Sequence, residues 1–120
     1  LLGRKMDLEL ARMALRNAMP KSESATTVDD VQKAVCDYFG IRLADLKGKR
    51  RHRSVTFPRM LAMYLCRQHL STSYPELGER FGGKDHTTVL SACRKIESLV
   101  EQGDLDVLGP LEAIQRRLGL

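Results

Sequence analysis

The sequence predicts an all-α fold, a helical bundle that contains a helix-turn-helix. Apolar residues recur at helical spacing in several segments, and glycine, proline and cap residues separate these segments. Strand-like alternation of apolar and polar residues is absent. Hydrophobic residues make up 42% of the 120-residue chain, enough for a packed core, while aromatic residues make up only 5%. Leu, Val, Ile, Met and Ala must therefore fill the core of a bundle of about five or six helices.

The first helical pattern is separated from the rest of the chain. Residues 7–19, "DLELARMALRNAM", carry apolar side chains at helical spacing after Asp7 as N-cap, and Pro20 ends the run. Residues 20–26 are polar and rich in turn and cap residues, which is typical of a linker. We expect the first helix to belong to a preceding domain and residues 27–120 to form the main one.

The next helix begins at Thr27, a good N-cap, with Asp30 three residues later as a variant of the capping box. Gly40 is a good helix stop. The predicted buried stripe consists of Val28, Val31, Val35 and Tyr38. Residues 41–48, "IRLADLKG", have room for only a short helical turn.

Helical spacing returns from about Val55 to Leu70, where Pro58 suits the first turn. Ser73 caps a further helix, which the adjacent Gly82 and Gly83 keep short.

Two more helices complete the prediction. The segment "DHTTVLSACRKIESLVEQ", residues 85–102, has an apolar stripe that runs from Val89 to Val100, and Gly103 ends it. The last residues support a short final helix that starts from Pro110.

Positive charge is concentrated in the middle of the chain. The whole chain has a net charge of +5, but the segment from Arg42 to Lys95 holds 12 Lys and Arg against 4 acids, a local +8. The remainder has 8 basic and 11 acidic residues, a net −3. The run "KGKRRHRSV", residues 47–55, has five basic side chains and no acid. Such a block favours a polyanionic partner over a merely solvated basic loop.

Cysteine and histidine give no sign of a disulfide framework or a metal site. Cys36, Cys66 and Cys93 are far apart and form no C-x-x-C pair, so we expect buried thiols in a reducing compartment. The three histidines, at positions 52, 69 and 86, have no cluster of further ligands nearby in the sequence. No apolar run approaches membrane length, and the start of the sequence is too polar for a secretory signal, so we expect a cytoplasmic protein.

The stretch from Gly78 to Lys84 spells G-x-x-x-x-G-K, which is most of a phosphate-binding loop. A nucleotide-binding loop follows a buried strand and ends in a Ser or Thr that holds magnesium. Here no strand precedes the glycines, and Asp85 occupies the Ser or Thr position. We therefore expect no ATP, magnesium or other cofactor to bind this chain.

The same residues fit a helix-turn-helix, in which the start of the second helix contacts base edges in the major groove. The polar residues at that start are Asp85, His86, Thr87 and Thr88. Asp accepts from cytosine or adenine amines, His donates to purine acceptors, and the Thr methyl packs on a thymine methyl. Helix capping is the alternative role for the first of them. The basic side chains expected to supply affinity and minor-groove contacts are Lys49, Arg50, Arg51 and Arg53.

The sequence "FGGKDHTTVLSACRKI", residues 81–96, closely resembles the signature F-G-G-[RK]-D-H-T-T-V of the bacterial replication initiator family DnaA, in its C-terminal DNA-binding domain. "VDDVQKAVCDYFGIRLADLKGKRRHRSVTFPRMLAMYL", residues 28–65, and "SYPELG", residues 73–78, extend the resemblance, which covers about residues 26–99. Residues 1–19 resemble the last helix of the ATPase lid that precedes this domain. The resemblance implies specific binding of duplex origin repeats, the DnaA boxes, in the initiation of replication.

Carried over by position, the resemblance implies three groups of DNA contacts. The minor-groove group consists of Arg51 with Lys49 and Arg53 beside it. The major-groove group consists of Asp85, His86 and Thr87, with Thr88 and Lys84 close to bases or phosphates. The backbone-side group consists of Arg67, Tyr74 and Pro75. The chain departs from the family where Leu70 replaces a common Thr, Met60 replaces a common Gln and Lys84 replaces the commoner Arg.

The resemblance also sets expectations for partners and activity. The family hydrolyses ATP with a domain that this sequence lacks, so we expect no enzymatic activity, and ATP and magnesium only in the full-length protein. Family members assemble on the origin through the ATPase domain, and acidic phospholipids act near the linker. We expect this chain to bind duplex DNA as a monomer, because no heptad seam is present. The competing hypotheses are a protein-interaction module and a nucleotide-binding protein.

Overall fold

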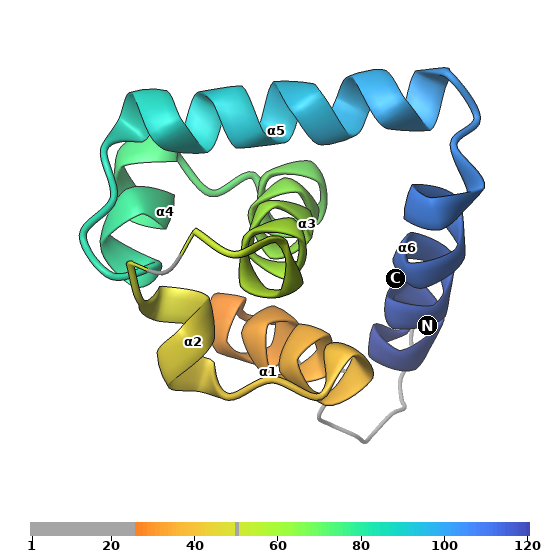
Figure 1. Cartoon of the computed structure of the whole chain (residues 1–120), viewed down its shortest axis with the longest axis horizontal. Coiled ribbons are helices and arrows are strands. Elements are labelled where there is room, and N and C mark those ends of the chain that lie inside the picture. Colours follow the sequence, from red (N-terminus) through yellow and green to blue (C-terminus); the bar gives the residue numbers. More distant parts are fainter. Residues whose placement is uncertain (1–25, 50) are drawn as a thin grey trace, which may run out of the picture.

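The computed structural model describes residues 26–49 and 51–120, and this part of the chain contains six helices and no strand. They are α1 (Val28–Phe39), α2 (Leu43–Lys47), α3 (Arg53–Leu70), α4 (Tyr74–Arg80), α5 (His86–Glu101) and α6 (Leu105–Leu118). In Figure 1, α3 is seen end-on in the middle, with α5 above it, α1 and α2 below, α4 on the left and α6 on the right. The all-α prediction is confirmed. The helix predicted in residues 1–19 and most of the predicted linker lie outside the described residues.

The ends of α1 follow from local sequence, as predicted. Thr27 Oγ1 accepts a hydrogen bond from the Asp30 N–H (3.2 Å), and the Asp30 carboxylate accepts one from the Thr27 N–H (2.9 Å). This capping box satisfies two N–H groups that have no partner inside the helix. Gly40 ends α1 in the left-handed conformation, with φ of 69°.

The prediction that Tyr38 lies in the buried stripe was wrong, since 48% of its surface is exposed. The buried face of α1 also includes Gln32, which is 1% exposed. The Gln32 Nε2 donates to the carbonyl of Arg80 at the end of α4 (2.8 Å). Ala34 and Val31, one and two turns before Tyr38 on the same side of the helix, are both buried, so the exposure of Tyr38 belongs to the last turn of α1.

Two prolines lie deeper in their helices than predicted. The helix α3 starts at Arg53, where His52 Nδ1 accepts from the Ser54 N–H (3.1 Å), and Pro58 is therefore its sixth residue. The final helix begins at Leu105 and not at Pro110, because Asp104 caps it by accepting from the Asp106 N–H (2.9 Å). At the sixth position a proline lacks the N–H that would bond to the carbonyl four residues earlier, and its ring crowds that carbonyl.

The core draws on all six helices, and Phe81 is the largest side chain that is fully buried. The three cysteines are free thiols inside it. Burial raises the pKa of Cys66 to about 12 and, as the largest contribution, that of Cys93 to about 11. Thiols of this kind hold their protons at neutral pH, so they act as small apolar side chains, as predicted.

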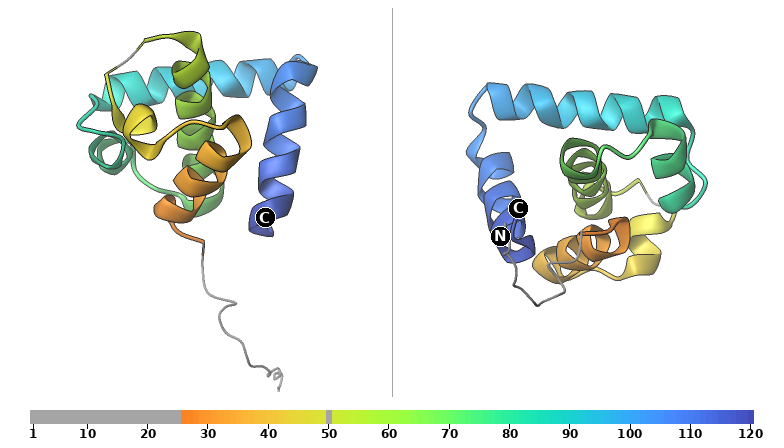
Figure 2. Two further views of the ribbon diagram at one scale, coloured as in Figure 1. Left: turned by 60° about the horizontal axis from the view of Figure 1, so that its bottom comes forward. Right: turned by 180° about the vertical axis from the view of Figure 1, so that it is seen from behind.

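Helix α6 closes the bundle beside α1, at a steep angle to α5 (Figure 2). Its inward face carries Val107, Leu111 and Ile114, each at most 6% exposed. At the surface, the Arg117 guanidinium pairs with the Asp37 carboxylate of α1 at 2.6 Å. Within the described residues, no helix combines the length and the apolar character needed to cross a membrane.

The turn between α4 and α5 requires glycine because backbones meet there. A Cβ atom on Gly82 would lie 1.9 Å from the Lys47 carbonyl oxygen at the end of α2, and one on Gly78 would lie 2.1 Å from the Lys84 carbonyl oxygen. Both distances are far below van der Waals contact. The neighbouring Gly83 also has a left-handed backbone, with φ of 78°, but a Cβ there would meet nothing within 4 Å.

Alanine substitutions at Gly82 and Gly83 will separate the effect of backbone strain from that of steric overlap. Gly83→Ala should lower the free energy of unfolding by about 1–2 kcal/mol, because its only cost is an alanine held in the left-handed backbone conformation. Gly82→Ala has the same backbone strain and also pushes α2 away, so we expect it to lose about 1–3 kcal/mol more. Urea titration followed by circular dichroism measures both changes. Equal losses would contradict the close approach of Gly82 to α2.

Candidate nucleic-acid interface

The helices α4 and α5 form the predicted helix-turn-helix. Ser73 caps α4 by accepting from the Glu76 N–H (3.3 Å), and Pro75 lies in its first turn. The turn closes when the Lys84 N–H donates to the Gly78 carbonyl (2.7 Å). These local contacts set the angle at which α5 leaves the turn, with its first residues exposed to solvent.

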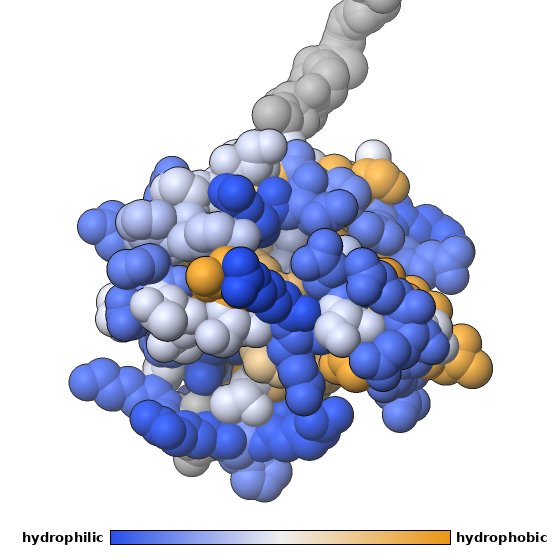
Figure 3. All heavy atoms as spheres, turned by 90° about the horizontal axis from the view of Figure 1, so that it is seen from above, coloured by the Kyte–Doolittle hydropathy of each residue, from blue (hydrophilic) through white to orange (hydrophobic). Residues whose placement is uncertain are grey.

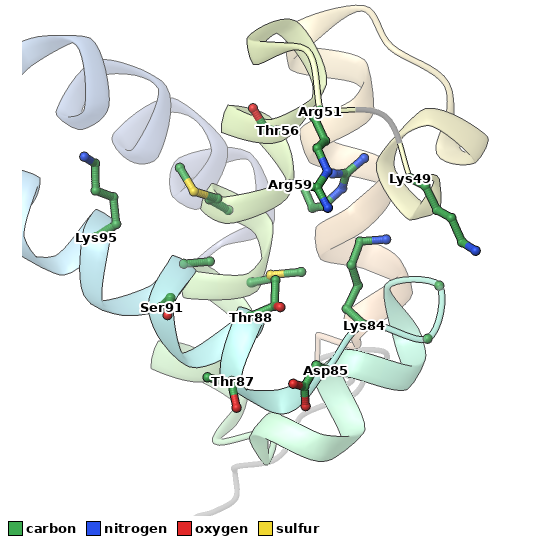
Figure 4. A pocket seen from close by; sticks show the side chains of 15 residues that line it. Lys49, Arg51, Thr56, Arg59, Lys84, Asp85, Thr87, Thr88, Ser91 and Lys95 are labelled. Atoms are coloured by element: carbon green, nitrogen blue, oxygen red, sulfur yellow. The ribbon is translucent and has the colours of Figure 1, made fainter.

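An open hollow of about 890 Å³ lies between the start of α3, the basic loop before it and the first turns of α5. Here the basic loop means the described residues 48, 49, 51 and 52. Figure 4 shows Arg51 on the α3 side of this hollow, with Asp85, Thr87 and Thr88 on the α5 side. The predicted site residues that line it are Lys49, Arg51, Lys84, Asp85, Thr87 and Thr88. The fold thus brings together two segments that are more than 30 residues apart.

The start of α5 presents a paired acid and imidazole. Asp85 occupies the N-cap position, but its side chain makes no cap hydrogen bond, so helix capping does not account for this carboxylate. Its Oδ1 lies 3.3 Å from Nδ1 of His86, and both side chains are about two-thirds exposed, at 68% and 64%. His86 does not line the hollow but stands next to it, at the first position of α5. Both groups are accessible to an incoming ligand.

The other predicted basic residues lie at different places. Arg53 does not line the hollow, and its guanidinium lies over the Phe57 ring, 5.4 Å from the ring centre. Arg50 lies outside the described residues. Lys49 and Arg51, on either side of it, are both exposed.

Two cations hold the end of α2, and we name this arrangement the α2 clamp. Arg59 Nε donates to the Leu46 carbonyl and its second terminal nitrogen to the Asp45 carbonyl, both at 2.8 Å. Lys84 Nζ donates to the carbonyls of Gly48 (2.6 Å) and Lys47 (3.4 Å). Carbonyls at a helix C-terminus lack partners within the helix, and cations there also meet the negative end of the helix dipole. The α2 clamp therefore fixes the chain where the basic loop begins.

The α2 clamp gives Lys84 a role that a nucleotide-binding loop does not have. Burial lowers the pKa of Lys84, and the nearby positive charges of Arg59 and Lys49 lower it further. Burial also lowers the pKa of Arg59, which is 7% exposed. Gly78 is buried inside α4, so its backbone does not line an open loop. The G-x-x-x-x-G-K spacing arises here from a helix–turn contact.

Arg67, Tyr74 and Pro75 form a separate group beside the N-terminus of α4, away from the residues that line the hollow. The guanidinium of Arg67 lies over the Tyr74 ring at 4.3 Å, and it donates to the Thr72 carbonyl (3.0 Å). Such stacking orients both side chains. Whether this group contacts DNA remains a prediction.

Sequence reasoning missed several residues of the hollow. Ser91 and Lys95 continue the exposed face of α5 at helical spacing from Thr88, a signal that the sequence already contained. Arg59 interrupts the apolar stripe of α3, and a charge in such a stripe indicates a buried partner. Thr56 also lines the hollow.

Two of the departures from the family pattern have structural explanations. Met60 lines the hollow with Met63 and Ala92, and these side chains give it an apolar floor. Leu70 packs against the hydrophobic core.

The hollow combines positive charge with neutral polar groups. The five cations that line it are Lys49, Arg51, Arg59, Lys84 and Lys95, and Asp85 is the one acid among its lining residues. Figure 3 shows the face that carries α5: hydrophilic side chains cover most of it, and apolar atoms gather toward the edge on the right, where α6 lies. A cationic surface with accessible hydroxyl, carboxylate and imidazole groups suits a phosphate backbone with readable base edges.

The described residues contain no group of three or more His, Cys, Asp or Glu side chains placed to hold a metal ion. His52 caps α3, while His69 lies in its last turn and bonds to Gln115 of α6 at 2.8 Å.

Comparison with known protein families identifies a domain type that covers more than half of the chain. The family described as "Bacterial dnaA protein helix-turn-helix" matches residues 28–96. The match runs from the start of α1 into α5, and it includes the basic loop, the glycine turn and the first turns of α5. The chain therefore belongs to the bacterial DnaA helix-turn-helix family, whose domains bind DNA in the initiation of replication.

Proposed function

We propose that this domain recognises DnaA-box duplexes by reading both grooves at once. The first turn of α5 enters the major groove, where Asp85, His86 and Thr87 contact base edges. Arg51 of the basic loop enters the adjoining minor groove, and Lys49 and Arg53 contact phosphates beside it. The domain acts by binding rather than by catalysis.

One observation carries this proposal: Asp85, Thr87 and Thr88 line the hollow on the α5 side and Arg51 lines it on the α3 side. The major groove of B-DNA admits an α-helix, and its edge pattern distinguishes all four base pairs. The minor groove is narrower and more negative in A·T-rich sequence, and arginine fits it well. Side chains of α5 on one side of the hollow and Arg51 on the other suit a duplex whose sugar-phosphate backbone lies between them.

The competing hypotheses make different predictions about base sequence and nucleotide. A protein-interaction module that uses its basic face would bind acidic partners without regard to base sequence. A nucleotide-binding protein would be stabilised by ATP. The position of Lys84 in the α2 clamp argues against the second, because the carbonyls of Lys47 and Gly48 already accept from its ammonium group.

A direct titration tests the proposed function. The chain should bind a DnaA-box duplex 1:1 and at least about 10³-fold more tightly than a scrambled duplex of equal length and composition, as specific DNA-binding proteins do. Fluorescence anisotropy at fixed salt, with and without ATP, measures both affinities. We expect ATP to change neither affinity nor melting temperature. Equal affinities for the two duplexes would rule out the proposed recognition.

Replacing the imidazole tests the major-groove assignment. His86→Ala should weaken binding to the box by about 1–3 kcal/mol, the typical worth of a base contact, and leave binding to scrambled DNA largely unchanged. His69→Ala, at the far end of α3, is the matched control and should preserve the ratio of the two affinities. An unchanged ratio in the His86 variant would show that α5 does not read bases through this side chain.

Replacing the loop arginine tests the minor-groove assignment. Arg51→Ala should lower affinity for the box by about 1–3 kcal/mol and reduce the preference for A·T over G·C pairs in one part of the site. Competition with duplexes that carry single A·T to G·C changes maps this preference. Arg116→Ala removes an equally charged, exposed side chain from α6 and should leave the preference intact. A uniform loss at all base pairs would indicate a phosphate contact instead.

A further inference from the structure

The α2 clamp joins the two halves of the proposed DNA site through a single residue. Lys84 directly precedes Asp85, the N-cap of α5. Its ammonium group bonds to the carbonyls of Lys47 and Gly48, and Gly48 is three residues before Arg51. The same side chain is therefore one peptide bond from the major-groove readers and hydrogen-bonded to the start of the basic loop.

We propose that Lys84 is a positioning residue, which sets where the basic loop places Arg51 relative to the start of α5. This inference rests on the proposed function and explains what fixes the geometry of the proposed DNA site. Arg59 assists by holding the two preceding carbonyls, of Asp45 and Leu46, from α3. Lys84 thus acts on DNA through Arg51 and not as a direct phosphate contact.

The packing around Lys84 shows how little freedom the junction has. The backbone of Gly82 approaches the Lys47 carbonyl so closely that a Cβ atom would lie 1.9 Å from it. Base pairs follow one another at about 3.4 Å along a duplex, so a loop shift of about half that distance would misplace a minor-groove side chain. A backbone contact fixed by a lysine on one side and an arginine on the other prevents such a shift.

The ammonium group of Lys84 is better placed to hold the start of the basic loop than to contact a DNA phosphate. It has three donors, and two of them are directed at the carbonyls of Lys47 and Gly48. The side chain is half-buried, in contrast to the exposed Lys49 and Arg51 of the loop. Release toward a phosphate would leave the carbonyls of Lys47 and Gly48 without this donor.

A double-mutant cycle distinguishes positioning from direct contact. The variants are Lys84→Met, Arg51→Ala and the two combined, with Lys33→Met on the exposed face of α1 as the matched control for lost charge. We expect Lys84→Met to weaken binding to the box about tenfold in the wild-type background. In the Arg51→Ala background the same change should cost less than about twofold, because the side chain that it positions is gone.

Two further measurements separate positioning from loss of charge or of folding. Affinity for scrambled DNA and the salt dependence of binding should match those of Lys33→Met, whereas a lost phosphate contact lowers the salt slope by about one. Circular dichroism at the binding temperature verifies folding. If Lys84→Met fails to fold, Lys84→Gln repeats the cycle with a shorter, neutral donor.

The outcomes that overturn the inference are specific. Additive losses in the cycle, or an unchanged affinity of Lys84→Met for the box, show that Lys84 does not act through Arg51. When the wild-type chain still prefers the box over the scrambled duplex, such a result overturns this inference alone. When the wild-type chain binds both duplexes equally, the proposed function fails and the inference fails with it.

Discussion

The last carbonyl groups of α2 depend on partners from outside this five-residue helix: Asp45 accepts from the Gly48 N–H and from Arg59, Leu46 from Arg59, and Lys47 from Lys84. A helix this short has little stability of its own, so its place in the fold depends on such contacts. The cations come from α3 and from the turn before α5, which are the two elements that flank the hollow. A requirement of backbone hydrogen bonding thereby fixes the spacing between the basic loop and α5.

The same arrangement concentrates positive charge beneath the hollow. Arg59 is buried there and Lys84 is half-buried, and burial lowers the pKa of both, so their charges are held at a cost in solvation. Carbonyl dipoles offset part of that cost. Because water screens these charges less than surface ones, their field adds to that of the exposed loop residues, which favours encounter with a polyanion.

Features set by neighbouring residues could be predicted from the sequence, and features set by distant contacts could not. The capping box of Thr27, the end of α1 at Gly40 and the glycine turn follow from local backbone chemistry, and the structure has them as predicted. The exposure of Tyr38 could not be predicted from helical spacing, because Val31 and Ala34 lie on the same side of α1 and are buried. The burial of Gln32 could not be predicted either, because its partner lies 48 positions later. The base-reading candidates were predictable from their place at a helix start. The α2 clamp was not, since Lys84 and its carbonyl partners lie 36 and 37 residues apart.

Helix α6 lies outside the segment that matches the family, yet it covers one side of the core. Three of its apolar side chains are buried, and burial of each contributes roughly 1.5–3 kcal/mol. A shorter polypeptide that stopped at Ile96 would also lose the last turn of α5, and it would leave apolar surface of α1 in water. A fragment that ends at Ile96 should therefore be less stable than one that keeps α6 through Leu118, although the family match covers only the shorter segment.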